Sequence, residues 1–466
     1  MNPYYDHNGI TIYHGDCRTV MGTLAASSVD AIVTDPPYGL EFMGVAWDTF
    51  NTPKGKGRMP NEWGDFGSRE HARHPSDVAR IMWNKGIALY DFSLAWAIEA
   101  LRVAKPGAHL LAFGGTRTHH RLTCAIEVAG WEVRDCVMWV YGSGFPKSLD
   151  VSKAIDKAAG VERKVGRKKV YAEGHIQNSS PYSPERSSIG TFIRTQADER
   201  LETNPTTAAA KQWSGWGTAL KPAWEPIIVA RKPLEGTVAQ NVQKWGVGAM
   251  NIDGCRVGFA SKADEIEAKL KNQHADFGSG PMTNRVFGKY FRNRDNYSPT
   301  GRWPANLIHD GSEEVVSGFP QTGPSRIQPR NQQARTEQPS KGAEAARIGL
   351  MGHNDDGGSA SRFFYTAKAS RSERGEGNNH PTVKPLALME YLIKLVTQDG
   401  AVVFDPFAGS GSTLVACKRL FRRCIGMEMS EDYCEIASKR VSGEVVQATM
   451  HFEVADAVAN RTLPLL

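Results

Sequence analysis

The first 145 residues alternate between short apolar runs and longer stretches of helical character. The run Val-Asp-Ala-Ile-Val-Thr at 29–34 predicts a buried strand, and residues 77–103 predict one or two helices that Lys105-Pro106-Gly107 stops. Strands that alternate with helices favour a parallel sheet with helices on both faces. The predicted elements of this part are strands at 10–13, 29–34, 108–113 and 133–141 and helices at 18–26, 77–103 and 118–129.

This alternation stops near residue 146 and returns near residue 376. The middle is polar and rich in Ser, Asn, Gln, Arg, Gly and Pro, with one strand-like segment at 225–230. After it we predict helices at 385–396, 413–421 and 431–441 and strands at 401–404 and 423–428. The expected organisation is therefore one α/β domain in two halves, 1–145 and 376–445, with an insert at 146–375 and a tail at 446–466.

Composition narrows the class of protein. Hydrophobic residues make up 40% and charged residues 23%, no apolar run approaches the ~20 residues of a membrane helix, and the start lacks a secretory signal. Seven cysteines without a CxxC pair argue against a disulfide framework or structural zinc and fit a reducing cytoplasm. Adjacent histidines such as His119 and His120 point apart on a helix, so no metal site is expected. The net charge of +6 permits a polyanionic partner.

The C-terminal half carries a strand, a glycine-rich turn, a helix, a second strand and an acid, in that order. Gly409 and Gly411 let the backbone approach a ligand, and the next helix start offers free N–H groups. Glu428, 19 residues after Gly409, is placed to bind a ribose diol. There is neither the third glycine of a dinucleotide fingerprint nor the Gly-Lys-Ser/Thr of a phosphate loop. The pattern therefore predicts an adenosine-containing cofactor that need not carry a pyrophosphate.

The sequence Asp35-Pro36-Pro37-Tyr38 directly follows the predicted strand at 29–34. It therefore lies at the carboxyl end of a strand, where open α/β sheets place their binding sites. The Asp35 carboxylate and the Pro36 carbonyl accept hydrogen bonds, and two prolines stiffen the turn. Tyr38 adds an aromatic face. This set suits a planar ring that carries an exocyclic amine.

Together the two motifs resemble those of the S-adenosylmethionine-dependent amino-methyltransferases of DNA. The DPPY form is typical of the adenine-N6 enzymes, and SPPY is commoner in the cytosine-N4 enzymes. Because DPPY precedes the segment Phe404–Gly411, the order resembles the permuted β group. Further segments resemble family elements: HPTVKP at 380–385, RVAKPG at 102–107, and GSGFPK at 142–147, a form seen in phage and prophage enzymes. The resemblance covers residues 9–145 and 378–442.

The resemblance implies a doubly wound, mostly parallel α/β sheet of the S-adenosylmethionine methyltransferase type, circularly permuted, with a large irregular insert. With the C-terminal half placed first, the sheet reads 401–404, 424–427, 10–13, 29–34 and 108–113, and an acid follows each of the first four strands. In family order, these acids contact the methionine part, the ribose, the adenine amine and the target base. The implied catalytic residues are Asp35, Pro36, Pro37 and Tyr38, and the implied cofactor-binding residues are Asp16, Thr382, Lys384, Asp405, Phe407, Ala408, Gly409, Gly411 and Glu428. Lys384 would neutralise the cofactor's carboxylate or a DNA phosphate.

The implied reaction is methylation of adenine N6 in a base extruded from double-stranded DNA, without a metal or a membrane. The insert would read the target, with phosphate contacts from Arg163, Lys164, Arg167, Lys168 and Lys169 unless this run is only a solvated surface. The loop at 40–76, with Trp47 and Trp63, would close over the base. A homodimer and a cognate restriction endonuclease are compatible with the sequence but not required. The implied location is the cytoplasm of a bacterium or of a phage-infected host.

Alternatives stay open from the sequence. Cytosine-N4 methylation is the nearest, because both amines have the same geometry. RNA amine methylation uses similar tetrapeptides, but the large insert and the permuted order favour DNA. The missing third glycine and the DPPY turn argue against a nicotinamide-dependent oxidoreductase. The intact Asp35, Gly409 and Gly411 argue against a catalytically dead DNA-binding module.

Overall fold

The computed structural model falls into two compact units. The first unit comprises Met1–Asp135, Ile228–Asn251 and Ala369–Leu466, and the second comprises Cys136–Ile227 and Ile252–Lys368. The structure describes residues 2–39, 77–144, 148–171, 176–178, 191–193, 198–262, 264–266, 268, 280–284, 288–292, 300–322, 328–329, 350–351, 358–367, 373, 378, 380 and 382–444. In these ranges no helix is both long and apolar enough to cross a membrane.

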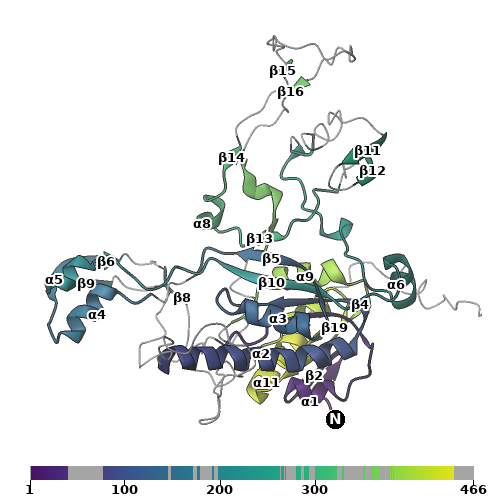
Figure 1. Ribbon diagram of the computed structural model, residues 1–466, viewed down its shortest axis with the longest axis horizontal. Helices are drawn as coiled ribbons and strands as arrows, with labels where there is room; N and C mark the ends of the chain where they lie inside the picture. Colours follow the sequence, from purple (N-terminus) through teal and green to yellow (C-terminus); the bar gives the residue numbers. More distant parts are fainter. Residues whose placement is uncertain are drawn as a thin grey trace, which may run out of the picture. The chain divides into compact units, whose positions relative to one another are not determined.

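A largely parallel sheet forms the first unit, with the strand order β1-β2-β20-β19-β3-β4 (Figure 1). Strand β1 pairs antiparallel with β2, and the other neighbours pair in parallel. The parts of β10 and β5 that belong to this unit follow β4. The strands are β1 (Tyr5–His7), β2 (Ile10–His14), β3 (Val29–Thr34), β4 (Ala104–Phe113), β5 (Glu132–Val140), β10 (Trp224–Arg231), β19 (Val402–Asp405) and β20 (Arg423–Glu428).

The order of the strands in space confirms the doubly wound, permuted fold. The two strands from the C-terminal half, β20 and β19, lie between β2 and β3 from the N-terminal half. The sheet therefore does not read 401–404, 424–427, 10–13, 29–34 and 108–113 from one side to the other, as the sequence analysis expected. It begins in the middle, at β19, and continues outward through β20 and β2 on one side and through β3 and β4 on the other. The reversal falls between β19 and β3, which is the point where sheets of this kind bind ligands.

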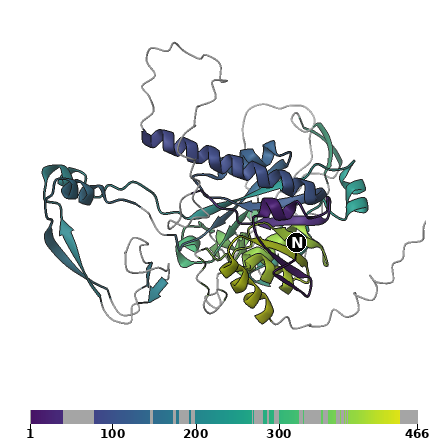
Figure 2. The ribbon, with the colours of Figure 1, turned by 90° about the horizontal axis from the view of Figure 1, so that it is seen from below.

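Helices cover both faces of this sheet (Figure 2). On one face lie α1 (Cys17–Met21), α2 (Asp77–Val103) and α3 (His119–Val128), and on the other lie α9 (Leu386–Val396), α10 (Ser412–Arg419) and α11 (Glu431–Gly443). A further helix, α6 (Val238–Trp245), packs beside β4. Thus the predicted α/β layering is confirmed, and residues 77–103 form one helix rather than two.

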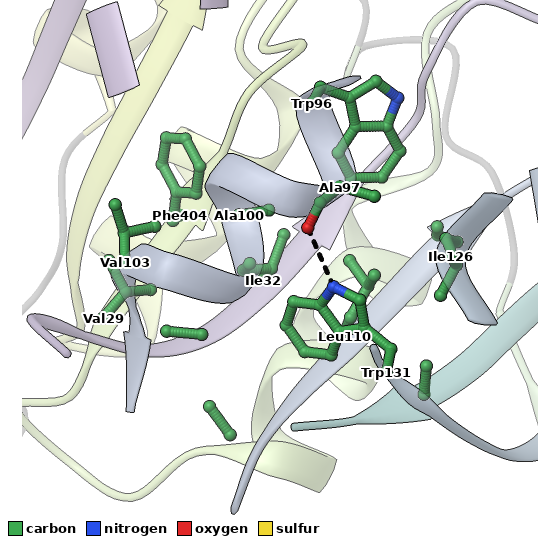
Figure 3. Close-up of a cluster of buried hydrophobic side chains, with 14 of the residues drawn as sticks. Val29, Ile32, Trp96, Ala97, Ala100, Val103, Leu110, Ile126, Trp131 and Phe404 are labelled. Carbon is green, nitrogen blue, oxygen red and sulfur yellow. Dashed lines mark hydrogen bonds between the residues drawn. The ribbon is translucent and has the colours of Figure 1, made fainter. Parts of the chain in front are cut away.

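The core under α2 fixes the position of strand β3 (Figure 3). Ile32 of β3 and Leu110 of β4 belong to one fully buried cluster with Trp96 of α2. The indole N–H of Trp131 donates to the Ala97 carbonyl at 3.0 Å, which ties the start of β5 to α2. Burial of this many apolar side chains makes the carboxyl end of β3 a rigid support for the residues that follow it.

Some predicted elements have different bounds. The helix expected at 18–26 ends at Met21, because Gly22 caps α1. Strand β4 starts at Ala104 and not at 108, so Lys105-Pro106-Gly107, read as a helix stop, already belongs to the strand. The reason is tertiary: Gly107 N–H donates to the Lys232 carbonyl, and Lys232 N–H donates to the Ala108 carbonyl. The strand-like segment at 225–230 is β10, whose end belongs to the first unit.

The second unit contains the other parts of β5 and β10 and most of the predicted insert. Strand β13 (Leu307–His309) lies between β5 and β18 (Tyr365–Thr366) and is parallel to both. Helix α4 (Val151–Ala158) packs on α5 (Ala208–Gln212), and β6 (Lys164–Tyr171) pairs antiparallel with β9 (Asp198–Asn204). Its other elements are β7 (Ile176–Asn178), β8 (Thr191–Ile193), η3 (Asp253–Cys255), β11 (Gly280–Asn284), β12 (Gly288–Arg292), α8 (Glu313–Val316), β14 (Gln321–Thr322), β15 (Gln328–Pro329), β16 (Leu350–Met351), β17 (Gly358–Ser359) and η4 (Ala360–Phe363).

Candidate active site

Four acids lie at the carboxyl ends of four neighbouring strands. Asp405 ends β19 and Glu428 ends β20, whereas Asp35 follows β3 directly and Asp16 follows β2. Because these four strands are parallel neighbours, their carboxyl ends share one edge of the sheet. The expectation that the acids line one edge is therefore met by the topology. Their side chains, however, have different surroundings.

Asp35 is held by two donors. The Tyr38 hydroxyl donates to one of its carboxylate oxygens, Oδ1, at 2.7 Å, and the Lys384 ammonium donates to the other, Oδ2, at 2.6 Å. Lys384 is also 3.3 Å from the Tyr38 hydroxyl. The Asp35 side chain keeps 20% of its surface exposed, and Pro36 beside it is buried. The turn thus presents a partly accessible carboxylate whose orientation is set from two sides.

Asp405 is buried, and hydrogen bonds within the protein hold its carboxylate. Its carboxylate accepts from the Thr34 hydroxyl at 2.6 Å, the Thr413 hydroxyl at 2.5 Å and the Phe407 N–H at 3.0 Å. Burial raises the pKa of Asp405 to about 6, and the charge of Asp35 acts in the same direction. The carboxylate therefore joins the end of β3, the glycine-rich turn and the start of α10. In the structure Asp405 holds together the segments around the site, and its direct contact with a cofactor stays a prediction.

Glu428 closes the glycine-rich turn. Its carboxylate accepts from the Gly409 N–H at 2.9 Å and from the Ser430 N–H at 2.8 Å. Burial raises the pKa of Glu428. Glu428 therefore lies beside Gly409, the first glycine of the motif that the sequence analysis identified. Ala408, in the same turn, is buried and donates its N–H to the Met427 carbonyl at 2.8 Å.

The two glycines of the turn are required for different reasons. Gly409 has a φ of +51°, and a Cβ there would lie 2.8 Å from Nε2 of His380. Gly411 has a φ of +82°, and a Cβ there would lie 3.0 Å from Cβ of Ala437 in α11. The sequence-based reason for Gly411, close approach of the backbone to a ligand, is thus not what its surroundings show. It lets α11 pack against the start of α10.

His380 and Arg440 support the turn from outside. The His380 ring packs edge-on against Tyr433 with 4.5 Å between ring centroids, and its Nδ1 lies 3.1 Å from the carbonyl oxygen of Thr382. Arg440 donates to the Ser410 carbonyl at 2.6 Å. Sequence reasoning identified His380 only as part of a motif and missed Tyr433 and Arg440. Their positions on an otherwise ordinary helix, α11, carry no local signal.

Asp16 and Phe407 lie just after the ends of β2 and β19. Asp16 caps α1 and accepts from the Arg18 backbone N–H at 2.9 Å and from its guanidinium at 3.0 and 2.5 Å. These hydrogen bonds lower the pKa of Asp16. Phe407 packs against Phe92 and Trp96 of α2, with centroid distances of 5.8 and 5.6 Å. Asp16 is thus an ionised acceptor, one-third exposed, beside the same end of the sheet.

The predicted DNA contacts lie in the second unit. Arg163 pairs with the fully buried Asp156 at 3.3 Å and is itself only 12% exposed. Its guanidinium also donates to the Ser152 hydroxyl at 3.1 Å. Arg163 therefore has a structural partner. Lys164, Arg167, Lys168 and Lys169 belong to β6, and their side chains lie outside the described residues.

Two further sequence predictions concern segments that the structure does not describe. The loop at 40–76, with Trp47 and Trp63, and the segment 145–147 lie outside the described residues. In the described ranges, no group of three or more His, Cys, Asp or Glu side chains is arranged to hold a metal ion.

The edge of the sheet fits an adenosine-containing ligand. Glu428 supplies carboxylate oxygens at the end of β20, and Asp16 supplies a second carboxylate just after the neighbouring strand β2. The two carboxylates are hydrogen-bond acceptors, which suits hydroxyls and an amine rather than a pyrophosphate. The residues that would hold the ligand are Asp16, Gly409 and Glu428.

Comparison with known proteins identifies the family. The model of the N6/N4 DNA methylases matches residues 29–439, which is most of the chain. The chain belongs to the N6/N4 DNA methylase family. It is a DNA methyltransferase, and S-adenosylmethionine is its cofactor.

Curated relatives and solved structures are similar to this chain as well. The type II methyltransferase M.HindIII of Haemophilus influenzae is 22% identical over 450 residues, covering 93% of this chain and 95% of the relative. The type II methyltransferase M2.DpnII of Streptococcus pneumoniae is 39% identical over 95 residues, covering 20% of this chain and 35% of the relative. The cytosine-N4-specific PvuII DNA methyltransferase matches with 12% identity and a TM-score of 0.41, covering 98% of this chain and 94% of that one.

The predicted contact of Glu428 with the cofactor can be tested. Replacing Glu428 with alanine should weaken binding of S-adenosylhomocysteine by about 10- to 100-fold, because a hydrogen bond to a charged group contributes roughly 1.5–3 kcal/mol. Calorimetric titration measures the change. Glu431, an exposed acid in the first turn of α11, is the matched control, and Glu431→Ala should bind as the wild type does. Equal affinities for the two variants would show that Glu428 does not bind the ribose.

Proposed function

We propose that this methyltransferase modifies the N6 amine of adenine in double-stranded DNA, at a specific site and in a base extruded from the helix. The observation that carries the proposal is the Asp35 carboxylate, partly exposed and held in orientation at the switch point of the sheet. An aspartate, rather than a serine, at the start of this tetrapeptide resembles the adenine-N6 enzymes. A base inside the duplex cannot reach such a carboxylate, so it must leave the stack.

The side chains of the turn have distinct tasks in this proposal. Asp35 and the Pro36 carbonyl accept the two N–H groups of the amine, which aims its lone pair away from the ring. Tyr38 provides the surface on which the base stacks. S-adenosylmethionine supplies a methyl group already activated on a sulfonium. When bound, it would give this methyl group to the amine nitrogen and leave as the thioether, and one amine proton would pass to water. Asp35 stabilises the positive charge that develops on the nitrogen, and much of the rate comes from positioning.

A direct experiment tests the target base. The protein is expressed with a plasmid in a host that lacks its own DNA methyltransferases, and the modified bases are mapped by single-molecule sequencing. We expect N6-methyladenine at one short sequence motif. N4-methylcytosine at such a motif would contradict the adenine assignment and leave the family intact. An Asp35→Ala strain is the control for methylation from other sources.

We also propose that the basic strand β6 binds DNA phosphates. Neutralising Arg167, Lys168 and Lys169 together should weaken DNA binding and reduce the salt slope of log K by about 0.9 for each phosphate that the variant no longer neutralises. Sequence preference should change little, because phosphate contacts position and do not specify. DNA affinity at several salt concentrations measures this, with cofactor affinity as the control. An unchanged slope would make the run a solvated surface and direct attention to the exposed pair Trp213 and Trp216, whose rings lie 5.0 Å apart.

A further inference from the structure

Lys384 occupies an unusual place for a lysine. Its side chain is only 8% exposed, and its ammonium lies 2.6 Å from Oδ2 of Asp35. The same ammonium lies 4.8 Å from the ring centroid of Phe113, at the end of β4, and 5.6 Å from that of Tyr38. A buried charge is costly unless it is paired, so Lys384 and Asp35 must be considered as one unit.

The two oxygens of the Asp35 carboxylate have different partners. Lys384 holds Oδ2, while the Tyr38 hydroxyl donates to Oδ1. A target amine that approaches Asp35 therefore meets one oxygen fixed by a buried ammonium and one oxygen held by a neutral hydroxyl. The hydrogen bond from a neutral donor is the weaker of the two, so Oδ1 is the oxygen that an incoming amine can take over.

We propose that Lys384 is a positioning residue for methyl transfer. It anchors Oδ2 of Asp35, while Oδ1 is released to the target amine as Tyr38 turns to the base. This inference rests on the proposed action of Asp35 at that amine. It differs from the role that the sequence suggested for Lys384, a contact with the cofactor's carboxylate or a DNA phosphate.

Electrostatics explains why a lysine would be needed there. An amine that becomes positively charged is stabilised by a preorganised negative charge beside it. The Lys384 ammonium fixes the direction of the second carboxylate oxygen, and misplacement of a reacting group by about 1 Å can cost roughly 100-fold in rate.

The same strand offers a matched control. At the start of β3, Lys105 pairs with Asp30 at 2.5 Å, and the two side chains are 27% and 11% exposed. Asp30 also accepts the Val402 N–H at 2.7 Å, so this pair joins β3 to its two neighbouring strands. Asp30 lies near the start of β3, and Asp35 directly follows its end. Removal of the Lys105 charge thus reports the general effect of breaking such an ion pair.

The experiment compares Lys384→Met with Lys105→Met. Methionine keeps most of the length and apolar character of the side chain and removes the charge. Single-turnover methylation is measured at saturating cofactor and DNA, together with S-adenosylhomocysteine affinity and thermal unfolding. For Lys384→Met we expect a rate about 100-fold lower, with cofactor affinity unchanged. Lys105→Met should alter only the melting temperature.

Two results would overturn the inference. One is a Lys384→Met enzyme whose rate at saturation matches that of Lys105→Met. The other is a normal rate at saturation with cofactor affinity lowered by more than about tenfold, or 1.4 kcal/mol, which would place Lys384 on the cofactor. If Lys384→Met does not fold, Lys384→Arg and Lys384→Gln replace it, and the arginine variant, which keeps the charge, should be the faster. A wild-type enzyme that methylates no amine in DNA would instead refute the proposed function.

Discussion

Replacing Asp35 with asparagine is expected to lower the single-turnover rate of methyl transfer by about 1,000-fold, while S-adenosylhomocysteine still binds normally. Asparagine keeps the shape of the side chain but cannot carry the negative charge that faces the reacting nitrogen. One of its two acceptor positions also becomes an N–H₂ group, which would oppose either the Lys384 ammonium or the target amine. The effect should therefore fall on the chemical step.

The measurement is rapid-quench methylation of a duplex that contains the mapped site, with calorimetry for the cofactor. Asp405→Asn is an informative comparison, because Asp405 is fully engaged by Thr34, Thr413 and Phe407. Both variants should lose stability, since Asp35→Asn leaves the buried Lys384 ammonium without its carboxylate, so the comparison depends on the rate at saturating cofactor. A rate above about a tenth of the wild-type value, a loss of less than roughly 1.4 kcal/mol, would remove Asp35 from the centre of the mechanism.

Gly411→Val is expected to destabilise the first unit by about 3 kcal/mol or more, through two causes that act together. A φ of +82° is strained for any residue with a Cβ and most of all for a β-branched one. In addition, the new Cβ would lie 3.0 Å from Cβ and 3.2 Å from Cα of Ala437, so α11 would have to move. Because α11 carries Arg440, which holds the Ser410 carbonyl, cofactor binding should weaken as a consequence.

Gly400→Val separates the two causes. Gly400 has a φ of +73°, but a Cβ there would meet nothing within 4 Å. Gly400→Val should show the backbone strain alone. The free energies of unfolding of the two variants are measured by urea denaturation, and their difference gives the contribution of packing against Ala437. If the two variants are equally stable, packing against Ala437 contributes nothing. The glycine would then be required for the backbone conformation only.

Several features were predictable from the chain because they depend on neighbours in sequence. The bounds of β3 at 29–34 and of β20 at 423–428 were predicted from their apolar runs, and the structure confirms them. Asp35 and Glu428 then follow at strand ends, since a parallel sheet places such residues at one edge. The glycine-rich turn was recognised for the same reason: its backbone conformation is set by residues within a few positions.

Other features depended on partners far away in the chain. Lys384 reads locally as a lysine before a helix, and only packing of the segment before α9 against β3 and β4 places it on Asp35, 349 positions away. Asp405 reads as a ligand contact, but the hydroxyl of Thr34 reaches it across the sheet, 371 positions away, and engages its carboxylate.

The sequence alone therefore determined the chemistry-bearing motifs, the strands that carry them and the family that they resemble. The tertiary structure decided which of these side chains remain available to a ligand and which are engaged by the protein itself. The physical reason is that backbone conformation follows from local sterics and apolar periodicity, whereas the partner of a buried polar group is chosen by whatever the fold brings within about 3 Å.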